Sequence, residues 1–347
     1  MKTGISVIIC CYNSAKRLPE TLQHLLQQQT KDLDWEIVIV DNASTDNTAA
    51  LACDILQQNL TSDKYKIVSE SQPGLIYARK KGFSIAQFDK LLYCDDDNWL
   101  DENYIQNASD ILNQHPEIMI LGGKGEPVFE KARPVWFDKY QGSFAVGPQG
   151  SVTSGIERVN AVYGAGTIIR RILFDQLQQV QFESLLTGRK ENQLISGEDI
   201  ELSRVAGYFG YYIAWSPQLT FKHLMTEGRM NWAYLKKLNF GFGRMRLYLH
   251  AYTYTETHNT APGQGLRLPL WADKYLHLVK QLIKYYPQIQ FKLSQEGNDE
   301  VLKFYALKGE MHELMLLKNG YMQVFEQIIK LKKRIATFTA GQSRKST

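Results

Sequence analysis

Three consecutive aspartates, Asp95 to Asp97, follow a hydrophobic run in the stretch LLYCDDDNWL. Adjacent carboxylates repel one another, so a chain gains nothing by crowding them at the end of a buried strand. Mg²⁺ and Mn²⁺ prefer oxygen ligands and often bridge one or two carboxylates to substrate phosphates. One carboxylate of such a segment can hold the metal while its neighbour accepts hydrogen bonds from sugar hydroxyls. The alternative is that the acids open a helix over DDNWLDENYI, where the helix dipole favours them.

A second acidic pair, Glu198 and Asp199, follows a glycine in the stretch SGEDIEL. The pattern predicts a helix that begins at these residues, and the helix dipole would stabilise their ionised form. Transfer to a hydroxyl with inversion needs one carboxylate that takes the acceptor's proton while the leaving group departs on the opposite side. The simpler alternative is that Glu198 or Asp199 only caps its helix.

Two usual phosphate-binding loops are missing from the sequence. No GxGxxG follows the first apolar run, and GxxxxGK[ST] does not occur anywhere. A nucleotide could still bind through a divalent cation, which would also neutralise a diphosphate and make it a better leaving group. The acidic segments are therefore compatible with a nucleotide substrate.

Apolar runs typical of buried parallel strands alternate with helical patterns over the first 120 residues. We expect strands at residues 5–11, 35–41, 65–71 and 90–97, and helices at 14–29, 43–60 and 74–86. Repeated βα units indicate an α/β domain with a mainly parallel sheet, which binds ligands beyond the carboxyl ends of its strands. Polar residues cluster at those expected ends, namely Tyr12, Asn13, Asp41, Asn42 and Asp95 to Asp97.

The second half of the chain is less regular. Glycines and prolines mark loops or short strands at 122–136 and 142–155, and a strand followed by a helix is expected within 162–177. A helix is expected at 196–210 and a strand at 211–217, where the aromatic stretch GYFGYYIAW favours core packing over sugar stacking. From about residue 232 the pattern is helical, with a hinge at 261–269 and a disordered tail over 339–347.

Composition indicates one large domain with an appendage, because the chain has 347 residues of which 44% are hydrophobic. The 4 cysteines lie in the first third at spacings that match no zinc or CxxC pattern, which favours packing roles and a reducing, cytoplasmic setting. The start, MKTGISVIICCYN, lacks the pattern of a signal peptide, and no apolar stretch is long enough to predict a membrane span.

Positive charge is concentrated at the C-terminus, where residues 266–347 carry 14 Lys and Arg against 7 Asp and Glu. A basic tail can meet an anionic neighbour such as a membrane surface, although a solvated basic helix is the simpler interpretation. The stretches 280–293 and 326–335 place lysines beside apolar stripes. They could lie on an anionic membrane, form a dimer surface, or pack as a helical appendage, which the leucine and isoleucine spacing favours. Nucleic-acid binding is disfavoured because no aromatic-basic motif accompanies the basic excess.

Six segments in a fixed order make the chain resemble the family 2 glycosyltransferases, inverting enzymes of the GT-A fold that use nucleotide sugars. They are SVIICCYNSAKRLPETL, VIVDNASTDNT, GLIYARKKGFSIA, YCDDDNWL, YGAGTIIRR, and GRKENQLISGEDIELSRVAGYFGYYIAWSP with the later FKH. The resemblance covers about residues 4–225. It implies a GT-A (Rossmann-like) catalytic domain over 1–230, in which a mixed sheet is flanked by helices, with a helical C-terminal region over 231–340. Within that domain, 1–100 would be the nucleotide-sugar half and 101–230 the acceptor half.

The resemblance also implies roles for individual residues. Asp97 would bind a divalent metal, Mg²⁺ or Mn²⁺, and His223 would be a metal or diphosphate ligand. Asp199 would be the catalytic base, and Glu198 beside it would contact the acceptor. The residues that would bind the base, ribose, diphosphate or sugar of the donor are Tyr12, Asn13, Asp41, Arg79, Asp95 and Asp96.

Three departures from the family pattern affect what is expected. Cys11 stands where proline is common before the tyrosine, and Lys80 stands where asparagine is usual after Ala-Arg. The Q-x-x-R-W motif of processive polysaccharide synthases is absent. Without that motif or a predicted membrane span, we expect one sugar to be transferred per binding event.

The expected activity is transfer of one sugar from a nucleotide sugar, with UDP the commonest nucleotide in the family, to a hydroxyl of a glycan or lipid-linked acceptor. The expected setting is polysaccharide biosynthesis in the cytoplasm or at the inner face of the membrane, and the chain could form a homo-oligomer. One alternative is a nucleotidyltransferase of similar fold, although CCYNSAKRLPE lacks the glycines that would hold a triphosphate. The other is a non-catalytic nucleotide-sugar-binding module, against which the presence of both Asp97 and Asp199 counts.

Overall fold

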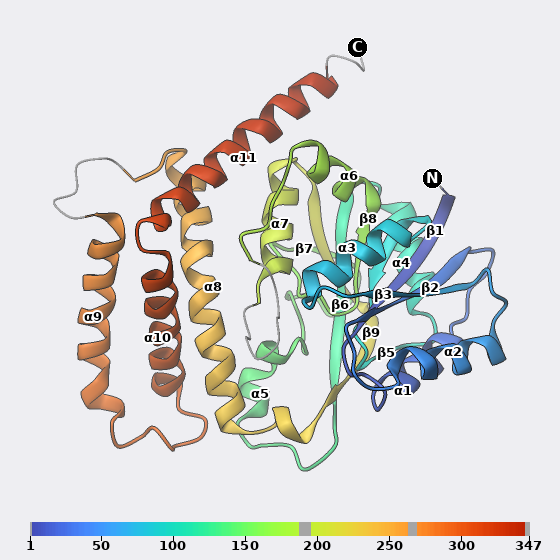
Figure 1. Ribbon diagram of the computed structural model, residues 1–347, viewed down its shortest axis with the longest axis horizontal. Coiled ribbons are helices and arrows are strands. Elements are labelled where there is room, and N and C mark those ends of the chain that lie inside the picture. The colour runs from blue at the N-terminus through green and yellow to red at the C-terminus, as the bar shows by residue number, and fades with distance from the viewer. Residues whose placement is uncertain (1, 187–195, 263–268, 344–347) are drawn as a thin grey trace. The chain divides into compact units, whose positions relative to one another are not determined.

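A computed structural model describes residues 2–186, 196–262 and 269–343 of the chain (Figure 1). The chain divides into two compact units. The first comprises Met1–Lys131, Gln141–Gln179 and Leu202–Met225, and the second comprises Ala132–Tyr140, Val180–Glu201 and Thr226–Thr347. Two segments from the middle of the sequence therefore group with the C-terminal helices, and the predicted domain boundary near residue 230 stays a prediction.

The first unit contains a nine-stranded sheet within the described part of the chain, in the order β3-β2-β1-β4-β8-β6-β9-β5, with β7 pairing β9. Four strands are parallel: β3 (Tyr65–Glu70), β2 (Trp35–Asn42), β1 (Lys2–Cys11) and β4 (Phe88–Tyr93). Strand β8 (Thr167–Arg170) is antiparallel to β4 and to β6 (Ile118–Phe129). Strand β9 (Tyr212–Met225) is parallel to β6 and antiparallel to β5 (Asn98–Leu100) and β7 (Glu157–Arg158). The sheet is mixed, as the resemblance implies. The parallel pairing expected from the βα pattern occurs from β3 to β4 and again between β6 and β9.

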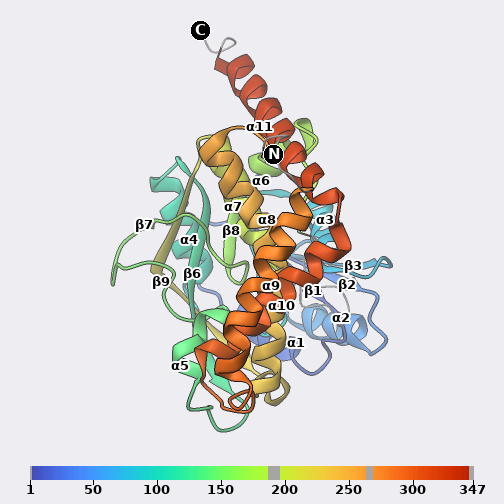
Figure 2. The ribbon, with the colours of Figure 1, turned by 90° about the vertical axis from the view of Figure 1, so that its left-hand side faces the viewer.

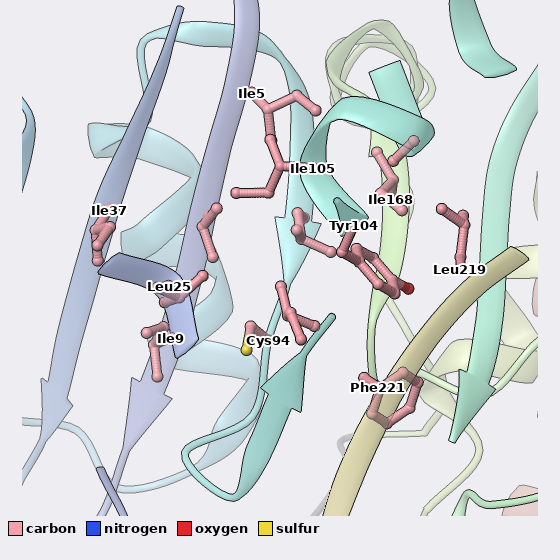
Figure 3. Close-up of a cluster of buried hydrophobic side chains, with 14 of the residues drawn as sticks. Ile5, Ile9, Leu25, Ile37, Cys94, Tyr104, Ile105, Ile168, Leu219 and Phe221 are labelled. Carbon is pink, nitrogen blue, oxygen red and sulfur yellow. The ribbon is translucent and has the colours of Figure 1, made fainter. Parts of the chain in front are cut away.

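Helices cover both faces of this sheet. Helices α1 (Leu18–Leu26), α2 (Thr48–Asn59) and α4 (Tyr104–Gln114) share a buried core with Ile5 and Ile9 of β1, and Figure 3 shows Leu25 and Ile105 in this cluster. Because side chains alternate along a strand, Ile8 points to the opposite face. That face is covered by α3 (Leu75–Ile85), whose Gly82 lies against Ile8. Helix α6 (Arg171–Gln179) contacts the sheet at β4 and β8.

The second unit is helical, as predicted for the C-terminal region. Its long helices are α8 (Trp232–His258), α9 (Leu270–Ile289), α10 (Asp299–Leu317) and α11 (Gly320–Ser343). In Figure 1, α10 lies between α8 and α9. Helices α8 and α10 approach so closely at two glycines that a side chain would not fit there. A Cβ on Gly243 would lie 1.9 Å from the Ala306 oxygen, and one on Gly309 would lie 1.9 Å from the Phe240 oxygen. The expected disorder over 339–347 is wrong up to Ser343, since α11 continues to that residue.

Shorter elements complete the described chain. They are α5 (Phe137–Tyr140), η1 (Gln141–Phe144), α7 (Glu198–Tyr208) and η2 (Glu227–Arg229). The predicted hinge lies largely outside the described residues. None of the described helices combines the length and the apolar content that crossing a bilayer requires.

Candidate active site

The carboxyl ends of β1, β2 and β4 meet at one edge of the sheet and carry three of the predicted donor-binding residues. Cys11 pairs with Asp41 in the β1–β2 register, and the backbone N–H of Cys94 donates to the Ile8 oxygen at 3.1 Å. Tyr12, Asp41 and Asp95 therefore lie at the ends of neighbouring strands. This is the edge at which open α/β sheets bind their ligands.

The aspartate triplet forms the connection between β4 and β5. Helix α4 begins only at Tyr104, so the alternative that the triplet opens a helix is wrong. Asn98 fixes the connection from its far end, because its Oδ1 accepts the Asp95 N–H at 3.3 Å and its Nδ2 donates to Asp97 Oδ1 at 3.2 Å. The short strand β5, which the sequence pattern does not predict, thus begins with a residue that holds the Asp95 backbone and the Asp97 carboxylate.

Asp97 and His223 face each other across the β5–β9 pair. The register pairs Asn98 with His223, and the Leu224 N–H donates to the Asp97 backbone oxygen at 3.0 Å. Asp97 Oδ1 lies 3.4 Å from His223 Nε2, and the two side chains are only 11% and 4% exposed. Two residues 126 positions apart, both predicted as metal ligands, are thus brought to one point.

The Asp97–His223 pair fits a divalent cation in its chemistry, because Mn²⁺ accepts both carboxylate oxygen and imidazole nitrogen. Among the residues that the structure describes, no group of three or more His, Cys, Asp and Glu side chains is arranged to hold a metal. The pair would therefore have to share a cation with other ligands. Substrate phosphates and water are the usual ones for Mg²⁺ and related ions.

Asp96 is held by the loop that precedes α1. Its Oδ2 accepts hydrogen bonds from Arg17 Nη2 at 2.6 Å and from the Ser14 hydroxyl, while Thr21 Oγ1 donates to the Asp96 backbone oxygen at 2.9 Å. Burial and then the neighbouring Asp97 carboxylate raise the pKa of Asp96 to about 6, although Arg17 acts in the opposite direction. The middle carboxylate is thus fixed in place by partners on the first unit.

The roles of Ser14 and Arg17 do not follow from the sequence pattern, which predicts a helix over residues 14–17. The helix α1 begins at Leu18, and residues 14–17 form the turn before it. Pro19 was the available signal, since proline is favoured in the first turn of a helix.

Tyr12 and Asn13, both predicted to line a base pocket, have different surroundings. The Tyr12 side chain is 53% exposed, so its ring can stack on a planar ligand. Asn13 has a left-handed φ of 49°, and its Oδ1 accepts the Thr45 N–H at 2.8 Å. Its own N–H donates to Ser44 Oγ at 3.0 Å. Asn13 therefore joins the loop after β1 to the loop after β2.

Asp41 and Arg79 supply a free acceptor and a positive charge near the same edge. Asp41 Oδ1 is buried and receives no hydrogen bond from any described residue. A buried acceptor without a donor costs free energy, which a ligand N–H or O–H would recover. The Arg79 guanidinium carbon lies 4.9 Å from the ring centroid of Tyr93, at the end of β4. Burial raises the pKa of the Cys10 thiol to about 12. The charge of Arg79 lowers this pKa and the charge of Asp95 raises it, so both side chains lie within electrostatic reach of Cys10.

Glu198 and Asp199 open helix α7, as predicted, and belong to the second unit. Asp199 Oδ1 accepts the Ile200 N–H at 2.8 Å. The same turn is anchored by Glu201, whose buried carboxylate accepts the Tyr252 hydroxyl at 2.6 Å and the Leu185 N–H at 3.0 Å. Burial raises the pKa of Glu201. Helix α8 therefore holds the start of α7, a connection that the sequence does not predict, because nothing near Tyr252 in the sequence points to Glu201.

The two acidic clusters lie in different units, Asp95 to Asp97 in the first and Glu198 with Asp199 in the second. Their convergence on one site stays a prediction. Residues 187–195, which carry most of the GRKENQLIS part of the resemblance, lie outside the described residues.

Comparison with known families agrees with this architecture. The model of the family described as "Glycosyl transferase family 2" matches residues 6–151. The glycosyltransferase GlyG of Streptococcus pneumoniae is 28% identical over 123 residues, which are 35% of this chain and 39% of that protein. The poly(ribitol-phosphate) beta-N-acetylglucosaminyltransferase TarP of Staphylococcus aureus is 24% identical over 136 residues, 37% of this chain and 41% of that protein. The chain thus spans about two-fifths of the length of these curated relatives.

Solved structures extend the likeness in fold over more of the chain. S. aureus TarS 1-349 in complex with UDP-GlcNAc superimposes with a TM-score of 0.53 and 16% identity, covering 98% of this chain and 92% of that one. GalNAc-T7 with UDP, GalNAc and Mn²⁺ superimposes with a TM-score of 0.50 and 17% identity, covering 74% of this chain and 54% of that one. The mixed sheet and its flanking helices are a GT-A fold. The likeness to family 2 glycosyltransferases in sequence is confined to residues 6–151, which are less than half of the chain.

Proposed function

We propose that the protein is an inverting, metal-dependent glycosyltransferase that moves one sugar from a UDP-sugar to a hydroxyl of a glycan or lipid-linked acceptor. The observation that carries this proposal is the Asp97–His223 pair, 3.4 Å apart, next to the fixed carboxylate of Asp96. A divalent cation bound there would neutralise the diphosphate and favour its departure. The protein's own groups account for the remaining requirements.

Residues at the sheet edge would bind the donor. Tyr12 would stack on the nucleotide base, and the unpaired Asp41 Oδ1 would accept an N–H of the base or a hydroxyl of the ribose. Arg79 would contact the base or the diphosphate. With Asp96 Oδ2 engaged by Arg17 and Ser14, Asp95 is the more available of the two carboxylates for a hydroxyl of the ribose or sugar.

Asp199 would remove the proton from the acceptor hydroxyl. The helix dipole at the start of α7 favours its ionised form, as a base requires. Glu198 would contact the acceptor beside it. Asp199 would take the hydroxyl proton as the acceptor oxygen attacks the sugar from the side opposite the diphosphate, which gives inversion.

The nucleotide and the acceptor are inferred from relatives. S. aureus TarS was crystallised with UDP and with UDP-GlcNAc, which supports a UDP-sugar as the donor here. A glucosyl-dolichyl phosphate glucuronosyltransferase of Haloferax volcanii, 22% identical over 245 residues, covers 69% of this chain and 75% of that protein. Its name supports a lipid-linked acceptor as one of the two acceptor classes. Transfer of a single sugar remains the expectation, since the processive motif is absent.

The test is turnover of nucleotide sugars with Mn²⁺ and with EDTA, preceded by a thermal-shift screen of UDP-, GDP- and dTDP-sugars. A ligand present at 100 times its Kd should stabilise the fold by about 2.7 kcal/mol. We expect selective stabilisation by one UDP-sugar with Mn²⁺ and release of UDP on addition of acceptor. Release of pyrophosphate from a nucleoside triphosphate would instead identify a nucleotidyltransferase, and binding without turnover would identify a non-catalytic module. Full activity in EDTA would contradict the metal dependence.

A further inference from the structure

Helix α9 exposes large apolar side chains on the face that does not pack in the helical unit. Its inner face is buried through Leu278 and Ile289, which are 1% and 0% exposed. On its outer face Leu276 is 46% and Ile283 67% exposed, and Phe291, just beyond the helix, is 90% exposed. Leu276 and Ile283 are seven residues apart and therefore lie on one side of the helix. Figure 2 views the helical unit with α9 in front of α10.

Positive charge surrounds these apolar side chains. No Asp or Glu occurs between Lys274 and Gln295. Lys274 is engaged with Glu310 of α10 at 2.9 Å. In contrast, Lys280, Lys284 and Lys292 are exposed, and none of them forms an ion pair with a residue that the structure describes. Between Lys274 and Gln295 the outer face of α9 and its extension thus combines apolar and cationic side chains without a carboxylate, whereas Asp273 in the first turn of α9 is exposed.

A second stretch of similar sequence behaves differently. In residues 326–335 of α11, lysines again stand beside an apolar stripe, but Ile328, Leu331 and Ile335 are 1%, 5% and 1% exposed. Packing, the interpretation that the sequence favours for both stretches, is confirmed for this one. It does not account for the exposed side chains of α9 and its C-terminal extension.

We propose that the outer face of α9, continued by Phe291 and Lys292, docks on an anionic bilayer surface. An amphipathic helix with lysines beside apolar side chains lies in the interfacial region, where its apolar groups enter the acyl boundary and its charges meet acidic headgroups. Tyr286, 51% exposed near the end of α9, is of the aromatic type enriched at that depth. Such docking would bring the protein to a lipid-linked acceptor, and only this consequence rests on the proposed function.

The charge arm of the test compares two matched double variants in vesicle flotation. Phosphatidylcholine vesicles with and without phosphatidylglycerol serve as the probe, with no nucleotide sugar present, so the result is independent of turnover. One lysine near an acidic surface is worth about fivefold in partitioning, so Lys280→Gln/Lys284→Gln should lower binding to acidic vesicles by about 30-fold. Lys330→Gln/Lys333→Gln removes two exposed charges from α11 and should leave binding nearly unchanged. Equal loss in both variants, or no binding by the unaltered protein, would overturn the proposal.

The apolar arm uses Ile283→Gln/Phe291→Gln, whose sites are exposed and should leave the thermal unfolding temperature unchanged. Loss of acyl-boundary contacts should lower vesicle binding on the order of tenfold. Sedimentation velocity of the same variant tests the competing occupant, a second copy of the chain. A dimer of the unaltered protein that this variant converts to a monomer, with vesicle binding unaffected, would assign the face to self-association and overturn membrane docking.

Discussion

The two acidic clusters are positioned by different parts of the chain. Asp95 to Asp97 are fixed by residues of the first unit, through Asn98 within the turn and through Ser14 and Arg17 from the loop before α1. Glu198 and Asp199 start a helix whose anchor, Glu201, is bonded to Tyr252 of α8, 51 residues along the chain. The first cluster lies inside the family match at residues 6–151, and the second lies outside it. The proposed donor-binding residues Tyr12 to Asp97 thus lie within the family match, whereas the proposed base lies beyond it and depends on contacts with α8.

Substitution of the proposed base should have the largest effect. Asp199→Asn keeps the shape of the side chain but removes its ability to take a proton, so we expect kcat to fall by about 10²–10⁴-fold. Binding of the donor should be unchanged, because the donor-binding residues belong to the sheet edge. Steady-state kinetics and a donor thermal shift measure the two effects. Transfer at the normal rate would refute the assignment of Asp199 as the base.

Asp97→Asn, in the first acidic cluster, should impair binding of the nucleotide sugar. Loss of the carboxylate weakens the proposed cation site, so nucleotide-sugar affinity in Mn²⁺ should fall by roughly 10–100-fold. In EDTA the variant and the unaltered protein should bind equally. Asp110→Asn removes the same charge from an exposed position of α4 and serves as the matched control. If both substitutions weaken binding equally, overall charge rather than a cation site would explain the effect.

Tyr252→Phe tests whether α8 positions the start of α7. The substitution deletes one hydrogen bond to a buried carboxylate, which should destabilise the protein by about 2 kcal/mol. If Tyr252 positions the base, kcat should fall while the KM for the donor stays constant. Tyr254→Phe is the control, because its hydroxyl has no hydrogen bond in the described structure. A loss of stability with unchanged kcat would restrict Tyr252 to a structural role.

Local patterns in the sequence were sufficient for the parallel strands β1 to β4 and for the helix start at Glu198. They were not sufficient for β6 (Ile118–Phe129), because the glycines and prolines of 122–136 predict loops or short strands there. The apolar run before Asp95 and the glycine before Glu198 are short-range signals that the structure reproduces in β4 and α7. The short strand β5 was not predicted, since three residues carry too little periodicity and its pairing with β9 is set about 120 residues away.

The parts of the site that escaped prediction depend on side chains that meet only after folding. Arg17 and Asp96 are 79 residues apart, and no periodicity relates a turn arginine to a distant strand end. The same holds for Glu201 and Tyr252. The Asp97–His223 pair was anticipated only through the family resemblance, because a histidine at the end of a strand has no distinctive pattern of its own.

The smallest predicted effect is the pH dependence of stability at two glutamates, one in each unit. Burial raises the pKa of Glu201 above its ordinary value of 4.5. The folded state therefore retains the proton over a window above pH 4.5, and the stabilisation that this provides is lost as the pH rises through the folded pKa. The difference in unfolding temperature between the unaltered protein and Glu201→Gln should shrink as the pH rises above 4.5.

The contribution of Glu157 to stability should change with pH in the opposite direction. Hydrogen bonds from Trp215, Val152 and Ser151 lower the pKa of this half-buried carboxylate to about 2. Its contribution to stability is present above pH 4.5 and is lost as the pH falls through the folded pKa, so the gap to Glu157→Gln should shrink toward acid. Thermal unfolding of both variants, measured above and below pH 4.5, gives the change of stability with pH for the two glutamates together. Equal slopes would mean that a global charge effect, rather than the separate surroundings of the two carboxylates, governs the pH dependence.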